Sequence, residues 1–159
     1  MTKNPYLKDG RLADVIAAIT ALGNYRYYKL SFEKCAEQIS NKPKEAERWG
    51  KIFSEHPEFF RINPKDEKAS LVWRRQHPKR YDPKRSVEIT REKFDVLTSE
   101  ERDGITRRPL EPSEITALVG IAVDLHERAL EQEKAGKWWV PIATAVLAFV
   151  GALAGARLS

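Results

Sequence analysis

The sequence predicts a mostly α-helical protein with one small β-hairpin and a single C-terminal transmembrane helix. Three observations predict this fold class. Apolar residues recur at helical spacing in several segments, two short β-type runs flank a polar turn, and an uncharged apolar stretch closes the sequence. The 159 residues leave room for one compact domain, a connecting helix and the anchor.

The first half of the chain contains three predicted helices and one brief strand. The first helix covers 11–22, and the aromatic-rich run 25–30 indicates a short strand. Ser31 is a suitable N-cap for the second helix. Pro43 opens the third helix, which reaches His56. The side chains that we expect in the core are Leu12, Val15, Ile16, Ile19, Leu22, Phe32, Cys35, Ala36, Ile39, Ala46, Trp49, Ile52 and Phe53.

A β-hairpin follows these helices. Its predicted strands are 59–62 and 70–74, and the polar residues 63–68 between them have turn chemistry. The order helix, short strand, helix, tight turn, helix and hairpin resembles the winged-helix variant of the helix-turn-helix, over about residues 10–76. The resemblance indicates no specific family. It implies a domain at 1–76 whose third helix enters the major groove and whose hairpin loop, the wing, touches the nucleic-acid backbone or minor groove.

Two segments connect this domain to the C-terminus. Residues 77–112 are predicted to be a linker, first basic and then acidic, with a short helix that begins after Thr90. Residues 113–136 are predicted to form an amphipathic helical stalk. Its apolar residues alternate steps of three and four, a heptad seam too short to assert a coiled coil. They are Ile115, Leu118, Ala122, Leu125 and Ala129.

Residues 137–159 are predicted to be a membrane anchor. The uncharged stretch 138–156 has 19 residues, and a helix of that length spans roughly 28 Å, close to a bilayer's hydrocarbon thickness. The alternative is a buried core helix. The anchor implies a tail-anchored, single-pass protein whose N-terminal domain is cytoplasmic. Gly151 and Gly155 form a Gly-x-x-x-Gly pair, which favours association of such helices and, together with the stalk, a homo-oligomer.

The net charge of +5 divides unevenly along the chain. Residues 1–86 hold 19 Lys and Arg against 11 Asp and Glu, whereas residues 87–136 hold 7 against 12. A basic first half points to an anionic partner, which is nucleic acid, anionic lipid or the acidic half of a neighbouring chain.

Positive charge gathers in the third helix and in the stretch from Lys68 to Arg85. The third helix also carries glutamates, which would repel phosphates. The stretch has seven basic residues and one acid, with aromatic side chains interleaved. This composition suits phosphate backbones and unstacked bases, or lipid headgroups. The predicted contacts with an anionic partner are Lys44, Arg48, Lys51, Arg74, Arg75, Lys79, Arg80, Lys84 and Arg85.

Enzyme and metal-site signatures are missing from the sequence. The histidines have no metal-ligand spacing, and Cys35 has no partner histidine nearby. We therefore expect no enzyme activity, cofactor or metal. The sequence predicts a membrane-tethered, non-enzymatic binding module that contacts nucleic acid through its wing and third helix. The alternative is a protein-interaction adaptor or self-assembling membrane effector whose basic segment docks on anionic lipid.

Overall fold

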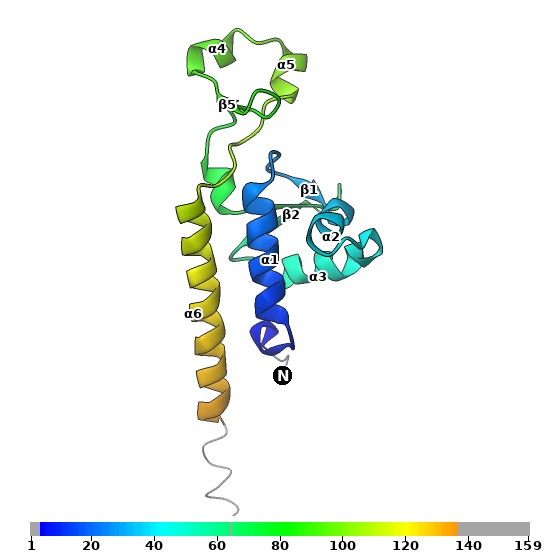
Figure 1. The fold of residues 1–159 in the computed structure, drawn as a ribbon, viewed down its shortest axis with the longest axis vertical. Helices are drawn as coiled ribbons and strands as arrows, with labels where there is room; N and C mark the ends of the chain where they lie inside the picture. Colours follow the sequence, from blue (N-terminus) through cyan, green and yellow to red (C-terminus); the bar gives the residue numbers. More distant parts are fainter. Residues whose placement is uncertain (1–3, 64, 137–159) are drawn as a thin grey trace, which may run out of the picture.

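The computed structural model describes residues 4–63 and 65–136. Helices dominate, and the strands are short (Figure 1). In chain order the elements are the 3-10 turn η1 (Pro5–Leu7), α1 (Arg11–Asn24), β1 (Leu30–Ser31), α2 (Phe32–Ser40), the 3-10 turn η2 (Pro43–Glu45), α3 (Ala46–Glu55), β2 (Phe60–Asn63), β3 (Lys68–Leu71), the 3-10 turn η3 (Trp73–Gln76), β4 (Tyr81–Asp82), β5 (Val87–Glu88), α4 (Arg91–Asp95), α5 (Ser99–Asp103) and α6 (Pro112–Gly136).

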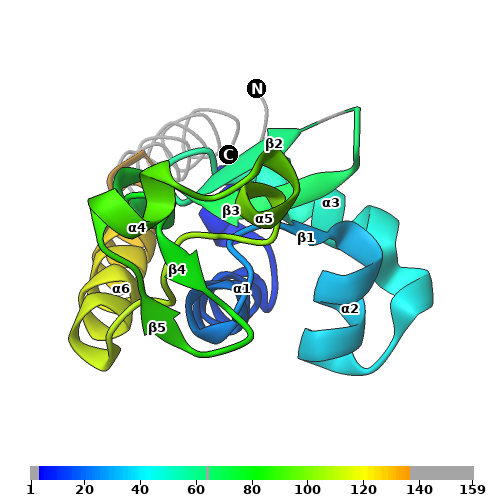
Figure 2. The same ribbon diagram turned by 90° about the horizontal axis from the view of Figure 1, so that it is seen from above.

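A three-stranded antiparallel sheet packs against the first three helices. Its strand order is β1-β3-β2, so β3 lies in the centre and pairs with both neighbours. Viewed from above, β1 and β2 lie near α2 and α3 (Figure 2). The predicted mostly helical fold with a small antiparallel sheet is confirmed.

Local sequence signals place the boundaries of α2 and α3. The Ser31 hydroxyl caps α2 by accepting a hydrogen bond from the Lys34 N–H at 3.3 Å. The helix ends at Asn41, whose φ of 54° is left-handed, a conformation that asparagine tolerates. Pro43 then opens η2, which leads into α3. The predicted helix from Pro43 to His56 is therefore present, with a 3-10 first turn.

Aromatic rings fill the core between α3 and the sheet. The ring centroids of Phe32, Trp49 and Phe60 lie 5.8, 6.1 and 5.0 Å from that of the buried Phe53. Gly50 makes room for Phe32, because a Cβ at position 50 would lie 2.8 Å from its ring. Most predicted core residues are buried: Val15, Ile19, Leu22, Cys35, Ala36, Trp49, Ile52 and Phe53, while Leu12, Ile16, Phe32, Ile39 and Ala46 are half-buried.

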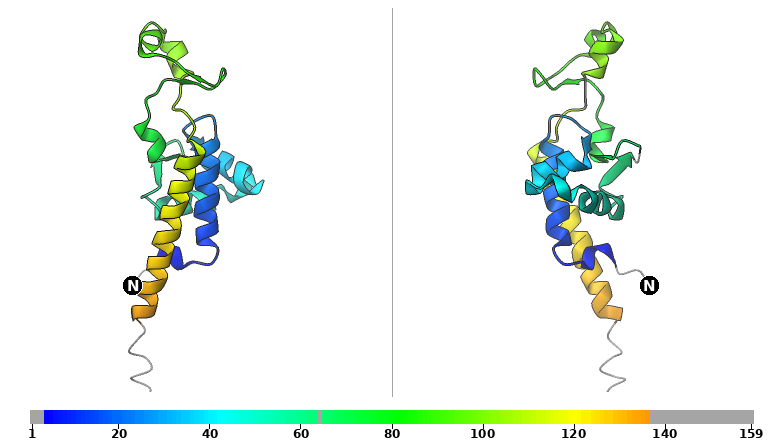
Figure 3. Two further views of the ribbon diagram at one scale, coloured as in Figure 1. Left: turned by 60° about the vertical axis from the view of Figure 1, so that its left-hand side comes forward. Right: turned by 90° about the vertical axis from the view of Figure 1, so that its right-hand side faces the viewer.

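The helix predicted as a separate stalk belongs to the domain core. α6 runs antiparallel along α1 (Figures 1 and 3), and its Leu118 and Ala122 are buried in the same cluster as Ile19. Gly23 of α1 lies against α6 so closely that a Cβ there would sit 3.1 Å from the Ile115 side chain. The apolar seam read as a heptad repeat is thus covered by α1 of the same chain, and the division into a domain at 1–76 and a helix at 113–136 stays a prediction.

The prediction of a transmembrane helix is corrected as well. In the part of the chain that the structure describes, no helix is both long and apolar enough to cross a membrane. α6 is the longest of these helices, and it carries charged side chains such as Asp124 and Arg128 on its exposed side, which are costly in hydrocarbon. The predicted span 138–156 lies outside the described residues. The assignment to a tail-anchored, single-pass membrane protein with a cytoplasmic domain is withdrawn.

Within the predicted linker 77–112, residues 77–109 form an arm that projects past the ends of α1 and α6 (Figures 1 and 3). The arm contains the β4–β5 pair, α4 and α5. Tyr81 and Thr106 join its two sides by backbone hydrogen bonds of 2.8 and 2.9 Å. At its base, the Arg108 guanidinium donates to both carboxylate oxygens of Glu114 in α6, at 2.9 and 3.2 Å.

Arg74 of η3 is wholly buried and joins three parts of the chain. Its guanidinium donates to backbone carbonyls in the last turn of α1, in the loop before β1 and at the base of the arm. Burial lowers the pKa of Arg74 to about 10, so the group stays charged at neutral pH. The accepting oxygens are those of Leu22 (2.8 Å), Tyr25 (2.7 Å), Tyr27 (3.1 Å), Arg107 (2.8 Å) and Arg108 (3.0 Å).

This arrangement explains why the strand predicted over 25–30 shrinks to Leu30–Ser31. The carbonyls of Tyr25 and Tyr27 point at Arg74 instead of at a neighbouring strand. Leu22 lies in the last turn of α1, where carbonyls have no partner within the helix and a cation is favourable.

Replacing Arg74 with methionine keeps its bulk but removes every donor. We expect Arg74→Met to lower the free energy of unfolding by about 3 kcal/mol or more, because several buried carbonyls lose a charged donor at once. Urea unfolding followed by tryptophan fluorescence measures this. The exposed Arg85→Met in the arm is the control and should change stability by about 0.5 kcal/mol or less. Equal effects of the two substitutions would show that Arg74 does not hold these segments together.

A second buried polar group, His56, ends α3. Its side chain is wholly buried, its Nδ1 lies 3.1 Å from the Glu58 carboxylate, and the Tyr6 ring packs edge-on at 4.6 Å between centroids. Among the described residues, its Nε2 has no hydrogen-bond partner. Burial lowers the pKa of His56 even though the Glu58 carboxylate acts in the opposite direction.

The sign of this shift predicts a loss of stability in mild acid. Below about pH 6.5 the unfolded chain takes up a proton at His56 that the folded chain resists, so the free energy of unfolding falls as pH drops. Basic neighbours lower the pKa values of Glu55 and Glu114, although burial by itself would raise them. Protonation of these two carboxylates therefore lowers the free energy of unfolding only in more acidic solution. We expect His56→Gln to make the free energy of unfolding less dependent on pH between about pH 7 and 5. Urea unfolding at a series of pH values measures this. An unchanged slope would rule out His56 as its source.

Candidate anion-binding site

The outer face of the sheet gathers basic side chains from separate parts of the chain. The register pairs Phe60 with Leu71 on the core face, and Arg61 with Ser70 on the opposite face. Because side chains alternate along a strand, the pair Asn63 and Lys68 also lies on the outer face.

These side chains line a cavity of about 240 Å³. Lys29 comes from the residue before β1, Arg61 from β2, Lys68 from β3 and Arg75 from η3. We call these four residues the sheet cations, and the space that they line the sheet cavity. Among the described residues, no carboxylate lines it.

The sheet cations are not neutralised by their surroundings. Within the described residues, none of them forms a salt bridge with a carboxylate, in contrast to Arg48 and Arg108. Arg61 donates only to the backbone carbonyl of Pro57, at 3.1 Å. Like charges brought together on one face destabilise a sheet. An anion bound among the sheet cations would relieve this repulsion.

A hydroxyl group lies beneath these cations. Ser70 lines the sheet cavity and is only 1 % exposed. Within residues 4–63 and 65–136, no hydrogen bond to its side chain is formed. A buried hydroxyl normally has a partner, so Ser70 has a donor to offer to a group that enters the cavity.

An aromatic ring adjoins the site. The Lys29 ammonium lies 5.3 Å from the Tyr28 ring centroid, and the Arg107 guanidinium lies 5.2 Å from it. Burial by itself would raise the pKa of Tyr28, but hydrogen bonds and positive charge from these two residues lower it. Next to it, Tyr27 is 39 % exposed. The lining residue Lys29 therefore adjoins a tyrosine ring, that of Tyr28.

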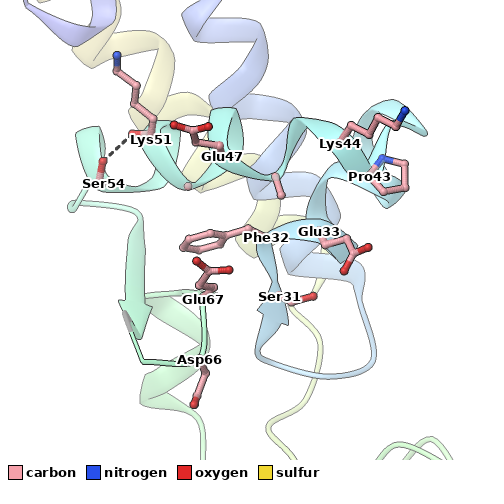
Figure 4. A pocket seen from close by; sticks show the side chains of 12 residues that line it. Ser31, Phe32, Glu33, Pro43, Lys44, Glu47, Lys51, Ser54, Asp66 and Glu67 are labelled. Atoms are coloured by element: carbon pink, nitrogen blue, oxygen red, sulfur yellow. Dashed lines mark hydrogen bonds between the residues drawn. The ribbon is translucent and has the colours of Figure 1, made fainter.

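The groove beside α3, where the resemblance places nucleic acid, has a different character. It lies between α3, the start of α2 and the β2–β3 turn, has a volume of about 850 Å³, and contains the half-buried Phe32 ring (Figure 4). Lys44 and Lys51 are outnumbered there by carboxylates, which disfavour a phosphate backbone. These carboxylates belong to Glu33, Glu47, Asp66 and Glu67.

The structure separates the basic residues that the sequence groups into one interface. Arg74 is buried and bound to carbonyls, while Arg48 pairs with Asp14 at 2.6 Å and stacks on Trp49. Lys44 and Lys51 lie in the α3 groove. The remaining predicted contacts divide between the arm, which holds Lys79, Arg80, Lys84 and Arg85, and the sheet cavity, which holds only Arg75.

Sequence reasoning did not identify Lys29 and Arg61 as site residues, and it included Lys68 only as the start of the basic stretch from Lys68 to Arg85, not among the predicted contacts. A usable signal was the alternation in Arg61-Ile62-Asn63 and in Lys68-Ala69-Ser70, where polar residues flank an apolar one. The predicted association residues Gly151 and Gly155 lie outside the described residues.

Other reactive groups do not form a second centre in the described part of the chain. Cys35 is buried, and burial raises the pKa of its thiol to about 12. No group of three or more potential metal ligands comes together there. No protein-family model matches the chain, and neither does any curated protein or solved structure.

Repulsion among the sheet cations predicts that removing one of them stabilises the protein. We expect Lys68→Gln to raise the free energy of unfolding by roughly 0.2–1 kcal/mol at low salt, with a smaller gain at high salt because ions screen the repulsion. Urea unfolding at two salt concentrations measures the gain. Lys79→Gln in the arm serves as the control and should show no comparable gain. A loss of stability in Lys68→Gln would contradict the repulsion.

Proposed function

We propose that this chain is a binding module that contacts nucleic acid through the sheet cavity and its sheet cations. The observation that carries the proposal is a cavity lined by four cations that, among the described residues, pair with no carboxylate and share the lining with none. Phosphate groups are the natural partners of such a site, because arginine and lysine form charge-assisted hydrogen bonds with their oxygens.

The tyrosines beside the cavity favour nucleic acid over an isolated anion. Tyr27 and Tyr28 directly precede Lys29, and the Arg26 guanidinium lies 5.5 Å from the Tyr27 ring centroid. Rings interleaved with cations suit a strand whose phosphates meet the cations while an unstacked base meets a ring. This favours a single strand or a frayed end over an intact duplex.

The proposal moves the interface away from α3. The α3 groove presents more carboxylates than lysines, and Arg48 is engaged by Asp14 and Glu45. A phosphate backbone laid along this helix would meet repulsion. On the outer face of the sheet, no carboxylate among the described residues lines the sheet cavity. A phosphate bound to the sheet cations would not meet that repulsion.

The alternative function, a protein-interaction adaptor, is favoured by the same groove. Its carboxylates surround the half-buried Phe32 ring (Figure 4), and an apolar patch with an acidic rim suits a basic protein segment better than a phosphate. The experiment below separates the two functions, because it tests the groove and the sheet cavity independently.

The test measures binding of the full chain to labelled single-stranded and duplex oligonucleotides of about 20 nucleotides, between roughly 50 and 200 mM salt. Replacing all sheet cations with glutamine should weaken single-strand binding by about tenfold or more and reduce the slope of log K against log salt by about 0.7 for each phosphate contact that is lost. Fluorescence anisotropy supplies both quantities.

Two control variants make the result specific to the site. Replacing Lys79, Arg80, Lys84 and Arg85 with glutamine removes the same amount of charge from the arm, and Lys44→Gln with Lys51→Gln alters the groove. Both should leave binding within about threefold of the unaltered chain, because neither removes a contact in the sheet cavity. An equal loss of affinity in the arm variant would show that binding depends on the net charge of the chain and not on the sheet cavity. No binding by the unaltered chain would end the proposal.

A further inference from the structure

We propose that the sheet cavity holds the terminal phosphate of a nucleic-acid strand, a phosphomonoester, in preference to an internal phosphodiester. This inference rests on the proposed function and specifies the part of the strand that the site recognises. The observations behind it are the amount of charge around one small cavity, the placement of the cations and the free hydroxyl at Ser70.

The charge around the cavity exceeds what an internal phosphate can balance. Four cations line a space of about 240 Å³. An internal phosphodiester carries one negative charge, whereas a phosphomonoester carries about 1.5 to 2 near neutral pH. A terminal phosphate therefore relieves more of the repulsion among the sheet cations than an internal one does.

The cations converge on one place and do not follow a line. They come from four separate segments, namely the loop before β1, β2, β3 and η3. A surface that tracks a backbone spreads its positive charge along a groove so that successive phosphates are each met. Convergence of arginines and lysines around a single point is instead the pattern for one multiply charged group.

Ser70 adds a donor at the bottom of the cavity. It is 1 % exposed, and within the described residues its hydroxyl has no hydrogen-bond partner. Asn63, the other polar residue in the lining, already donates to Asp66 at 2.7 Å and accepts from the Lys65 N–H at 3.3 Å. Ser70 is thus a neutral donor that is not already engaged, whereas one of the two N–H groups of the Asn63 amide is committed to Asp66. A terminal phosphate presents three free oxygens, one more than a phosphodiester, so it satisfies the cations and the hydroxyl together.

The neighbouring rings distinguish a strand end from free phosphate. Tyr28 contacts Lys29, whose side chain lines the cavity, and the preceding Tyr27 is partly exposed. A nucleoside attached to the bound phosphate would leave the cavity where a base can meet an aromatic ring. Inorganic phosphate fills the cavity but gains nothing from the rings.

The experiment compares one oligonucleotide sequence in three forms: with a 5′-phosphate, with a 3′-phosphate, and with hydroxyls at both ends. Binding to the full chain is measured by anisotropy. We expect one phosphorylated form to bind about tenfold more tightly than the unphosphorylated form. Inorganic phosphate at millimolar concentration should abolish that preference. The phosphorylated strand should then bind with the affinity of the unphosphorylated strand.

Single substitutions assign the preference to the cavity. Ser70→Ala and Lys68→Gln should bring the phosphorylated and unphosphorylated strands to similar affinity, while Ser54→Ala, a serine in the α3 groove, should keep the preference. The two substitutions lie on the outer face of the sheet, and unfolding curves confirm that each variant is folded before binding is compared.

The outcomes separate this inference from the function that it rests on. Equal binding of all forms by the unaltered chain would overturn the terminal-phosphate inference and leave the proposed function standing. Binding of inorganic phosphate without binding of any oligonucleotide would overturn both. A preference that survives in Ser70→Ala and Lys68→Gln would place the terminal phosphate elsewhere and would also overturn the inference.

Discussion

The buried guanidinium of Arg74 is the constraint on which the rest of the structure depends. It holds the end of α1, the loop before β1 and the base of the arm by donating to carbonyls from each of them. Among the described residues, no Asp or Glu carboxylate is buried together with the Arg74 guanidinium. The cation is instead stabilised by peptide dipoles, which keeps it charged and leaves its position set by backbone geometry.

This anchoring has a direct consequence for the candidate site. Arg75 follows Arg74 in η3, and the loop held by Arg74 ends at Lys29. The same contact that organises the chain interior therefore helps to place two of the sheet cations, Lys29 and Arg75, which line the cavity together with Arg61 and Lys68. The hydrogen bonds of Arg74 that stabilise the fold therefore also help to fix the positions of Lys29 and Arg75. Displacing Arg74 would move these two cations apart.

The fold sorts basic residues into distinct roles that their sequence positions do not reveal. Arg74 is structural, Arg48 is paired with carboxylates, the lysines of α3 lie among acids, and the basic residues of 79–85 lie in the arm. In the sequence, all of them look like one interface. Local charge density is a poor guide here, because a contact surface is assembled from segments that are distant along the chain.

The sequence by itself determined the elements whose causes are local. Ser31 and Asn41 bound α2, apolar spacing placed the buried faces of α1 and α3, and the polar turn after β2 indicated the hairpin. Only the tertiary structure decided that α6 packs on α1, that 77–109 forms an arm, and that Lys29, Arg61, Lys68 and Arg75 share one cavity. These features depend on strand register and on packing between segments far apart in sequence, and neither is encoded in a local pattern.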